Sequence, residues 1–410
     1  MVNVRIRMYR TGFGDCFLLS FGSPSAARHI LVDFGAHMHG EIGTMEPIMD
    51  DIESETGKKL EVVIATHPHR DHISGFGKFA TRFTDFTIGE VWLPWTDNPA
   101  DTQAKKLQKK QLALYDRLDN HLRLALGATE SDPRYASALH ALSNLRGNQP
   151  ATDALGRGFG TGTPRYFQAG DRVPKVGAIT GLSAEILGPP RDQAFFSRMD
   201  PPADQRFLSA PGDMSGAVHP FPALELHRRD KVLKQLVRKS RQPEVPSEEI
   251  ERLNEIAETP ADRLALVLDN VRNNTSLVVV FRYRGKALLF PGDAQWGSWQ
   301  SWIGTDDATR LIGELDFLKV AHHGSHNATP VAVVKALRAS GLAAMISTQV
   351  KPYPTIPRKP LIVELEKHCG GHIAVRSDWI KCTGAPAGPK MPVKLPKGYK
   401  IGKLAVDYRL

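Results

Sequence analysis

Residues 66–72 read Thr-His-Pro-His-Arg-Asp-His and come directly after the β-branched run LEVVIA. In this H-x-H-x-D-H spacing, alternate side chains of a tight loop point the same way, so His67 and His69 can share one metal ion. Asp71 and His72 follow as the chain turns into a helix, and they can hold a second metal. Imidazole and carboxylate are the usual ligands of catalytic zinc and also suit manganese. The spacing therefore predicts a metal site.

Other imidazole and carboxylate side chains also lie at the ends of predicted strands. Asp33 ends HILVD, Asp293 ends KALLFPGD, and His322 and His323 follow LDFLKVA. Loops at strand ends are where a rigid sheet presents functional groups. Two metals can activate a water and stabilise the charge on a leaving oxygen, which suits phosphodiester and ester hydrolysis alike. These side chains are therefore expected to join the metal site.

The chain alternates between strand-like and helical stretches. Apolar alternation and β-branched runs predict strands over the following residues: 4–9, 16–21, 29–33, 60–66, 87–93, 182–187, 276–283, 286–293, 315–321, 343–348 and 404–408. Helices are predicted over 330–341 and 360–369. Two polar, helical insertions are predicted at about 98–150 and 191–268. The glycine-rich stretch 156–164 matches no phosphate-binding loop and is expected to be a connector.

The composition limits the class of protein. The 410 residues are 41% hydrophobic and 24% charged, which excludes a collagen-like or disordered chain. Three cysteines without CxxC spacing, no signal peptide and no long apolar run predict a cytoplasmic protein that does not cross a membrane. The net charge of +9 suggests an anionic partner. Positive charge concentrates in the predicted helix 227–241 and in Lys390, Lys394, Lys397, Lys400 and Lys403.

These motifs resemble a known family. THPHRDHISGFG is similar to the metal-binding signature of the metallo-β-lactamase fold, and ILVDFG, LLFPGD and LKVAHHGS are similar to its other metal-site strands. The combination of GFGDCFLL, NNTSLVVVF, LLFPGDA and LKVAHHGSHNAT resembles the metallo-β-lactamase-like domain of the ComEC family of DNA-uptake channels, and that domain's soluble relatives. The motifs span residues 11–329, and the resemblance does not extend to the two helical insertions.

The resemblance implies a four-layer αββα sandwich, with two mixed β-sheets face to face and helices outside. It implies one domain over 1–410 that is interrupted by the two insertions. Asp293 would bridge the metals, Asp33 would fix a ligand histidine, and Asp71 and His322 would act on water and substrate. Of the paired histidines, His323 is favoured as the ligand, with His322 facing the substrate. The implied ligands of two zinc or manganese ions are His67, His69, Asp71, His72, Asp293 and His323.

The sequence departs from the family pattern at the first metal. Most members supply a third histidine between the first motif and the bridging aspartate. The histidines in that interval lie in helical or insertion contexts: His121, His140, His219 and His227. The ComEC-like pattern instead has Asn-x-x-Ser-Leu, matched here from Asn273 and Asn274 onward. We therefore expect Asn274 or a water to replace the third histidine, which favours a labile zinc or manganese pair.

Three further groups have two interpretations each. Ser325 and His326 precede a predicted helix and could bind phosphate, or Ser325 or Thr329 could simply cap the helix. His37 and His39 could line the cleft or lie in an exposed loop. The tryptophans at 296, 299 and 302 are expected to pack in the core rather than to stack on bases.

The sequence thus predicts a metal-dependent hydrolase that acts on a phosphodiester in nucleic acid or a nucleotide. The main alternative is hydrolysis of a small ester, thioester or lactam. A third possibility is a protein-binding scaffold that keeps a vestigial metal site and contacts its partner through the insertions. Lys319, which alternates with apolar neighbours before His322, is expected to be solvated or to support the site from behind.

Overall fold

The computed structural model describes most of the chain. The described residues are 3–36, 45–126, 148–198, 200–207, 271–349, 356–370, 373–375 and 397–410. Several sequence expectations lie outside them. These concern His37, His39, His140, His219, His227, the basic segment 227–241, Cys382, Lys390 and Lys394, and the side chain of His121 is also not described.

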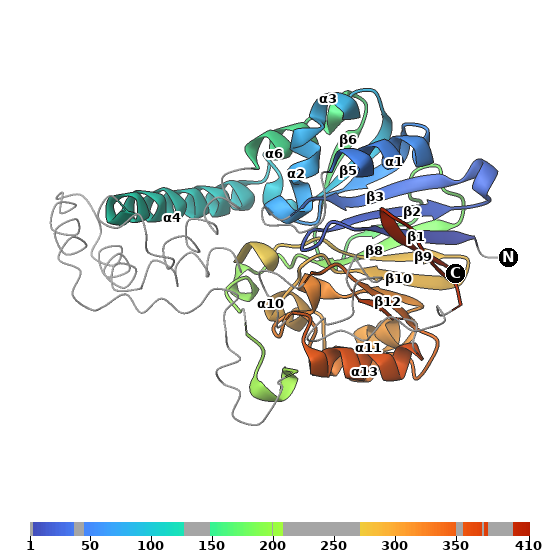
Figure 1. The fold of residues 1–410 in the computed structure, drawn as a ribbon. Coiled ribbons are helices and arrows are strands. Elements are labelled where there is room, and N and C mark those ends of the chain that lie inside the picture. Colours follow the sequence, from blue (N-terminus) through green and yellow to red (C-terminus); the bar gives the residue numbers. More distant parts are fainter. Residues whose placement is uncertain are drawn as a thin grey trace.

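Two β-sheets lie face to face and form the centre of the molecule (Figure 1). The eight-stranded sheet has the order β14 (Tyr399–Ile401), β15 (Ala405–Arg409), β1 (Val4–Tyr9), β2 (Cys16–Phe21), β3 (Arg28–Phe34), β4 (Lys59–Ile64), β5 (Thr87–Pro94) and β6 (Thr163–Phe167). The seven-stranded sheet has the order β13 (Ile373–Val375), β12 (Ala343–Ile346), β11 (Phe317–Lys319), β10 (Lys286–Phe290), β9 (Val278–Tyr283), β8 (Leu182–Gly188) and β7 (Arg172–Val173).

Both sheets are mixed, and their parallel halves determine where the site forms. Strands β3 to β6 are parallel to one another, as are β10 to β13. The carboxyl ends of parallel strands meet at one edge of a sheet. Asp33, at the end of β3, therefore lies beside the loop that follows β4. Asp293 and His323, which follow β10 and β11, meet at the corresponding edge of the second sheet.

Helices cover the outer face of each sheet (Figure 1). The first sheet is covered by α1 (Glu46–Thr56), α2 (Arg70–Lys78), α3 (Ala80–Phe83) and α6 (Gln149–Gly156). The second is covered by α10 (Trp296–Gln300), α11 (Asp306–Gly313), α12 (Val331–Ala336) and α13 (Lys359–Cys369). The long helix α4 (Thr102–Leu126) projects away from the sandwich. This arrangement confirms the four-layer αββα fold.

Burial follows from these layers. In β1, Val4, Ile6 and Met8 enter the core between the sheets, whereas Arg5 and Arg7 point to the other face and pair with carboxylates of α1. Every residue of β2 is buried, because its two faces pack on the opposite sheet and on the helical layer. The sandwich therefore has one apolar core between the sheets and one beneath each helical layer.

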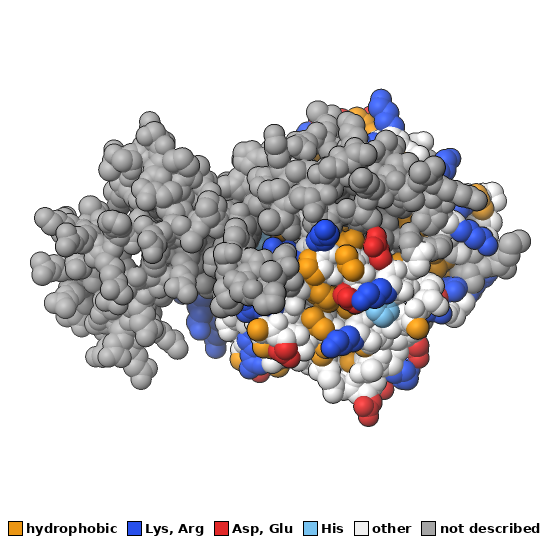
Figure 2. All heavy atoms as spheres, turned by 60° about the horizontal axis from the view of Figure 1, so that its bottom comes forward, with side chains coloured by type: hydrophobic (Ala, Val, Ile, Leu, Met, Phe, Trp, Pro, Cys, Tyr) orange, Lys and Arg blue, Asp and Glu red, His pale blue; other side chains and the backbone are white. Residues whose placement is uncertain are grey.

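The helical layer of the second sheet carries a partly apolar hollow of about 630 Å³. Val331, Val334 and Val363 line it, with Lys335 and Lys359 beside them. Figure 2 shows apolar side chains gathered on this side of the molecule, with Lys and Arg side chains among them. Part of the chain's positive charge is thus carried by this layer.

Some local expectations were wrong. The helix predicted over 330–341 spans only Val331–Ala336, and Pro330 is its N-cap, so neither Ser325 nor Thr329 caps it. The end of the glycine-rich stretch 156–164 is not a connector, since it enters strand β6. The cysteines are packed thiols, as expected: Cys16 and Cys369, the two that the structure describes, are free and buried. Within the described residues, no helix is both long enough and apolar enough to cross a membrane.

Gly35 allows the first sheet to touch the start of α2. A Cβ at this position would lie 2.1 Å from the carbonyl carbon of Asp71 and 2.3 Å from the backbone nitrogen of His72. We expect Gly35→Ala to lower the free energy of unfolding by about 1–3 kcal/mol, because backbone atoms cannot move aside as a side chain can. Urea unfolding measures the change. In Gly156→Ala the new Cβ meets no atom within 4 Å, so this control should keep wild-type stability; equal loss in both variants would contradict the close-approach argument.

Candidate metal centre

Residues 66–72, which run from the end of β4 into the first turn of α2, are called the metal loop below. His67 and His69 are buried in it, and His67 Nε2 lies 2.9 Å from His69 Nδ1. Burial lowers the pKa of His67 well below its usual value and that of His69 to about 3. Both rings are therefore neutral, and neutral imidazole is the form that binds a metal. These two neighbouring nitrogens are called the first candidate site below.

Four more groups form a second candidate site. The ligand atoms of Asp71, His72, Asp293 and His323 all lie within 4.8 Å of one another. Asp293 Oδ2 is 3.0 Å from His72 Nε2 and 3.4 Å from His323 Nε2. Asp71 Oδ2 is 3.5 Å from His323 Nε2. The two sites adjoin, because the rings of His67 and His72 have centroids 4.2 Å apart.

The donors of the second site fit a divalent metal ion. The Nε2 atoms of His72 and His323 are buried and form no hydrogen bond with the described part of the chain, although carboxylate oxygens lie close to them. Burial by itself lowers the pKa of His323, but Asp293 and Asp71 outweigh burial and raise it to about 10. The two carboxylates thus favour positive charge here, and a metal ion that binds would take the place of the proton on His323. Imidazole and carboxylate ligands around such a point suit zinc or manganese.

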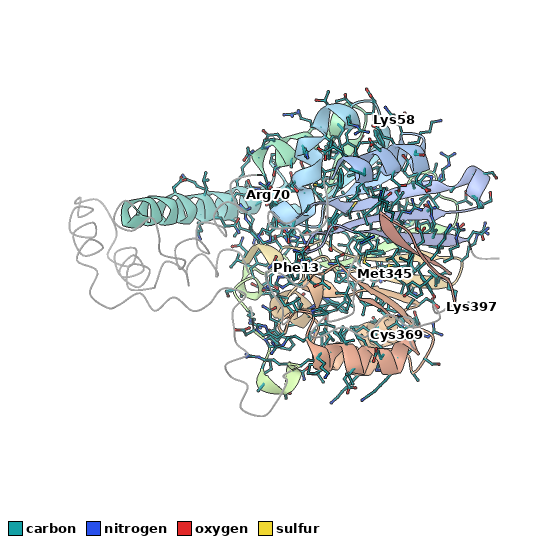
Figure 3. The ribbon with its side chains drawn as sticks, in the orientation of Figure 1. Phe13, Lys58, Arg70, Met345, Cys369 and Lys397 are labelled. Atoms are coloured by element: carbon teal, nitrogen blue, oxygen red, sulfur yellow. The ribbon has the colours of Figure 1, made fainter. Side chains whose placement is uncertain are left out.

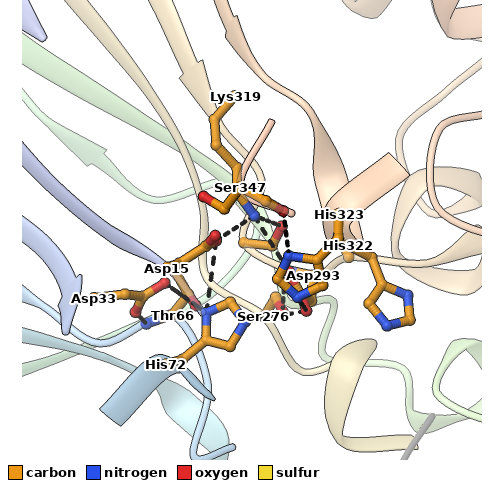
Figure 4. Close-up of polar contacts among 12 residues, drawn as sticks. Asp15, Asp33, Thr66, His72, Ser276, Asp293, Lys319, His322, His323 and Ser347 are labelled. Carbon is orange, nitrogen blue, oxygen red and sulfur yellow. Dashed lines mark hydrogen bonds and ion pairs between the residues drawn. The ribbon is translucent and has the colours of Figure 1, made fainter. Parts of the chain in front are cut away.

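Asp33 fixes the orientation of His72. Its Oδ2 lies 2.8 Å from His72 Nδ1, as Figure 4 shows, and accepts a hydrogen bond of 2.8 Å from Thr66 Oγ1. Its Oδ1 accepts a hydrogen bond of 2.7 Å from the Thr66 backbone. The carboxylate therefore holds both the metal loop and the ring that turns Nε2 toward the second site. Such support of a ligand histidine is common in metal centres.

The paired histidines point in different directions (Figure 4). Both have positive φ, 44° for His322 and 56° for His323, a conformation that is uncommon for residues other than glycine. His323 enters the second site, and its Nδ1 lies 2.9 Å from the carbonyl oxygen of Ser347. His322 turns away from the cluster and is held by Ser325 Oγ at 3.0 Å and Gln295 Nε2 at 3.3 Å. The structure thus brings only His323 to the ligand group.

Asn274 has a structural part in this region. Its Nδ2 donates to the carbonyl oxygens of Phe196 and Arg198, and its Oδ1 accepts from the backbone of Gln295 and Ser298. These bonds use both N–H groups and both oxygen lone pairs of the amide, so Asn274 has no atom left to bind a metal ion at the first site. The neighbouring Asn273 is also buried, and within the described residues its Oδ1 accepts no hydrogen bond. Of the two neighbouring amides, the one whose oxygen accepts no hydrogen bond from the described residues is therefore Asn273.

Other candidates lie beside the site rather than in it. Ser325 donates to Asn327 and holds His322, and His326 pairs with Asp200 at 3.3 Å. Trp299 is buried in the core beneath the helices, and Trp302 packs against it.

Sequence reasoning missed Asp15, which is buried behind Asp293. Of the two expectations for Lys319, the structure shows the supporting position: the side chain is buried and pairs with Asp15 and Asp293. The signal that could have found Asp15 is an acidic residue directly after the glycine turn GFG.

The sandwich and the ligand-bearing strand ends define a metallo-β-lactamase-type fold. The family model of the metallo-beta-lactamase superfamily matches residues 9–140. The matched segment contains the metal loop and Asp33, and the structure adds Asp293 and His323 from the second sheet. The chain is thus similar to a superfamily whose members are generally metal-dependent hydrolases. No curated protein matches the chain.

Proposed function

We propose that the chain is a metal-dependent phosphodiesterase that acts on nucleic acid or on a nucleotide. One observation carries the proposal: the paired nitrogens of His67 and His69 adjoin the four-ligand group of the second site. Bound metal ions supply a water of lowered pKa and stabilise negative charge on the leaving oxygen. Zinc and manganese both suit the ligands.

The side chains divide the remaining tasks. Asp293 presents one oxygen toward the ligand nitrogens of His72 and His323, which suits a ligand of the second site, and the family resemblance implies that it also bridges to the first. Asp71 is the candidate to orient the attacking water, because its carboxylate lies at the rim of the second site. His322 is the candidate to contact the substrate. Burial lowers its pKa to about 4, so the ring is neutral, and its single N–H is the group that would donate a hydrogen bond to a phosphoryl oxygen.

Positive side chains near the first site support an anionic substrate. Arg70 directly follows His69 at the start of α2, and Figure 3 shows it at the same end of the sandwich as Phe13, whose ring packs edge-on against His323. Arg272 lies near enough to His69 to contribute to the lowering of its pKa. A phosphodiester carries a negative charge at the group that is cleaved, whereas the carbonyl group of a lactam or an ester is neutral. The motifs that resemble the ComEC-type domain support the same choice, because that domain belongs to a DNA-uptake protein.

A substrate panel tests the proposal. Purified protein with zinc or manganese is assayed on bis(p-nitrophenyl) phosphate, single-stranded DNA and RNA, and in parallel on a thioester and a lactam. We expect metal-dependent turnover of the phosphodiesters only, and cleavage of nucleic acid that falls steeply with salt. Turnover of the thioester or lactam alone would replace the proposal with the small-molecule hydrolase. Absence of turnover on every substrate and metal would favour a scaffold, with the projecting helix α4 as a surface for a protein partner.

A further inference from the structure

A buried lysine lies behind the proposed bridging aspartate. Lys319 is the last residue of β11 and is 2% exposed. Its Nζ donates to the carbonyl oxygen of Gly292 at 2.9 Å and to Asp293 Oδ1 at 3.2 Å. The same ammonium group forms an ion pair with Asp15, which is 1% exposed (Figure 4). All the hydrogen-bonding directions of the ammonium are therefore used inside the protein.

The lysine and its partners join the two sheets at the metal centre. Asp15 immediately precedes β2 of the first sheet, whereas Lys319 ends β11 and Asp293 follows β10 in the second. The Asp15 backbone nitrogen also donates to the carbonyl oxygen of Asp71 at 2.9 Å. Asp15 thus contacts the metal loop through its backbone and the second sheet through its side chain.

The contact with Lys319 gives the two oxygens of the Asp293 carboxylate different partners. Oδ1 faces the ammonium group, and Oδ2 faces His72 Nε2 at 3.0 Å and His323 Nε2 at 3.4 Å. A carboxylate held at one oxygen has little freedom to rotate, so the other oxygen keeps a fixed direction. That direction is toward the ligand nitrogens of the second site.

Stability alone does not explain the buried pair. Buried ion pairs often contribute nothing to stability compared with apolar residues of similar size, because desolvation offsets their attraction. A methionine could fill most of the volume of Lys319 without that cost. What an apolar side chain cannot do is donate to both Gly292 and Asp293 and so fix the carboxylate.

We propose that Lys319 is a positioning residue of the metal centre, which holds Oδ1 of Asp293 so that Oδ2 is presented to the metal ions, and that Asp15 anchors the lysine. The proposal rests on the metal binding assumed in the proposed function, but not on the substrate. Metal affinity therefore tests it even if no phosphodiester is cleaved.

The test compares Lys319→Met with the double variant Asp15→Asn/Lys319→Met. Cobalt and zinc affinities are measured by competition with a chromophoric chelator, cobalt absorption reports the ligand geometry, and thermal unfolding gives the stability of the metal-free protein. We expect Lys319→Met to weaken binding of the second ion by about 10–100-fold, as losses around metal ligands do, and to change the cobalt spectrum. The double variant removes both charges, so it should regain stability but not affinity.

A second lysine–aspartate pair provides the control. Lys286 Nζ lies 2.8 Å from Asp316 Oδ1. This pair lies where β10 and β11 begin, whereas Asp293 and Lys319 lie where these two strands end. Lys286→Met should keep wild-type metal affinity. The proposal is overturned if Lys319→Met binds both ions with wild-type affinity and an unchanged cobalt spectrum. It is also overturned if the double variant regains full metal affinity, because Lys319 would then serve only to neutralise the charge of Asp15. If Lys319→Met does not fold, the double variant alone tests the proposal: weakened metal affinity supports it, and wild-type affinity overturns it.

Discussion

Asp293→Ala is expected to lower kcat for phosphodiester cleavage by about 10³-fold or more, since charge stabilisation by metal ions contributes several kcal/mol to the transition state. Asp293 Oδ2 lies near ligand nitrogens from both sheets, from His72 in the metal loop and from His323 after β11. Its loss removes the group that joins them. Steady-state rates on bis(p-nitrophenyl) phosphate at saturating metal measure the effect.

Asp316→Asn is the matched control for that variant. Asp316 is also a buried aspartate, but it precedes β11 and binds Lys286 and Arg338 at the opposite end of the strand pair from Asp293. Its replacement should reduce stability and leave kcat of the folded protein near the wild-type value. If Asp293→Ala keeps more than a tenth of the wild-type kcat, the bridging role of this carboxylate is contradicted.

Metal loading is expected to stabilise the protein strongly. Asp15, Asp33, Asp71 and Asp293 gather near one another, and Lys319 is the buried lysine paired with two of them. Divalent ions offset the remaining repulsion, and a ligand that binds only the folded state at a thousand times its Kd contributes about 4 kcal/mol. Thermal unfolding of chelator-treated protein, with and without added zinc or manganese, measures the shift. A melting temperature that no divalent ion changes would contradict the expected loading.

The metal loop could be predicted from sequence because its information is local. The spacing of His67, His69, Asp71 and His72 lies within one loop after an apolar strand. Asp293 and His323 could be predicted because each follows a strand, and the ends of parallel strands meet. The contact between Lys319 and Asp15 could not, since it joins residues far apart in the sequence, and no local pattern records such a pair.

The sandwich itself was predicted, but several of its edges were not. The strands missed were β6, β7, β13 and β14, which are short or lie toward the sheet edges. The sequence of β6, Thr163–Phe167, lacks the apolar alternation that marks a strand, and in the structure most of its residues are only half-buried. Its conformation comes from pairing with β5, which is a tertiary effect that sequence propensity does not contain.

Metal analysis of the purified chain tests the central claim most directly. The wild-type protein, loaded with zinc or manganese and freed of excess ions, should hold two ions per chain by mass spectrometry of the native protein. His67→Ala should lose the ion of the first site, and Asp293→Ala should lose at least one ion. A wild-type chain that retains no metal, or variants that retain as much metal as the wild type, would contradict the account.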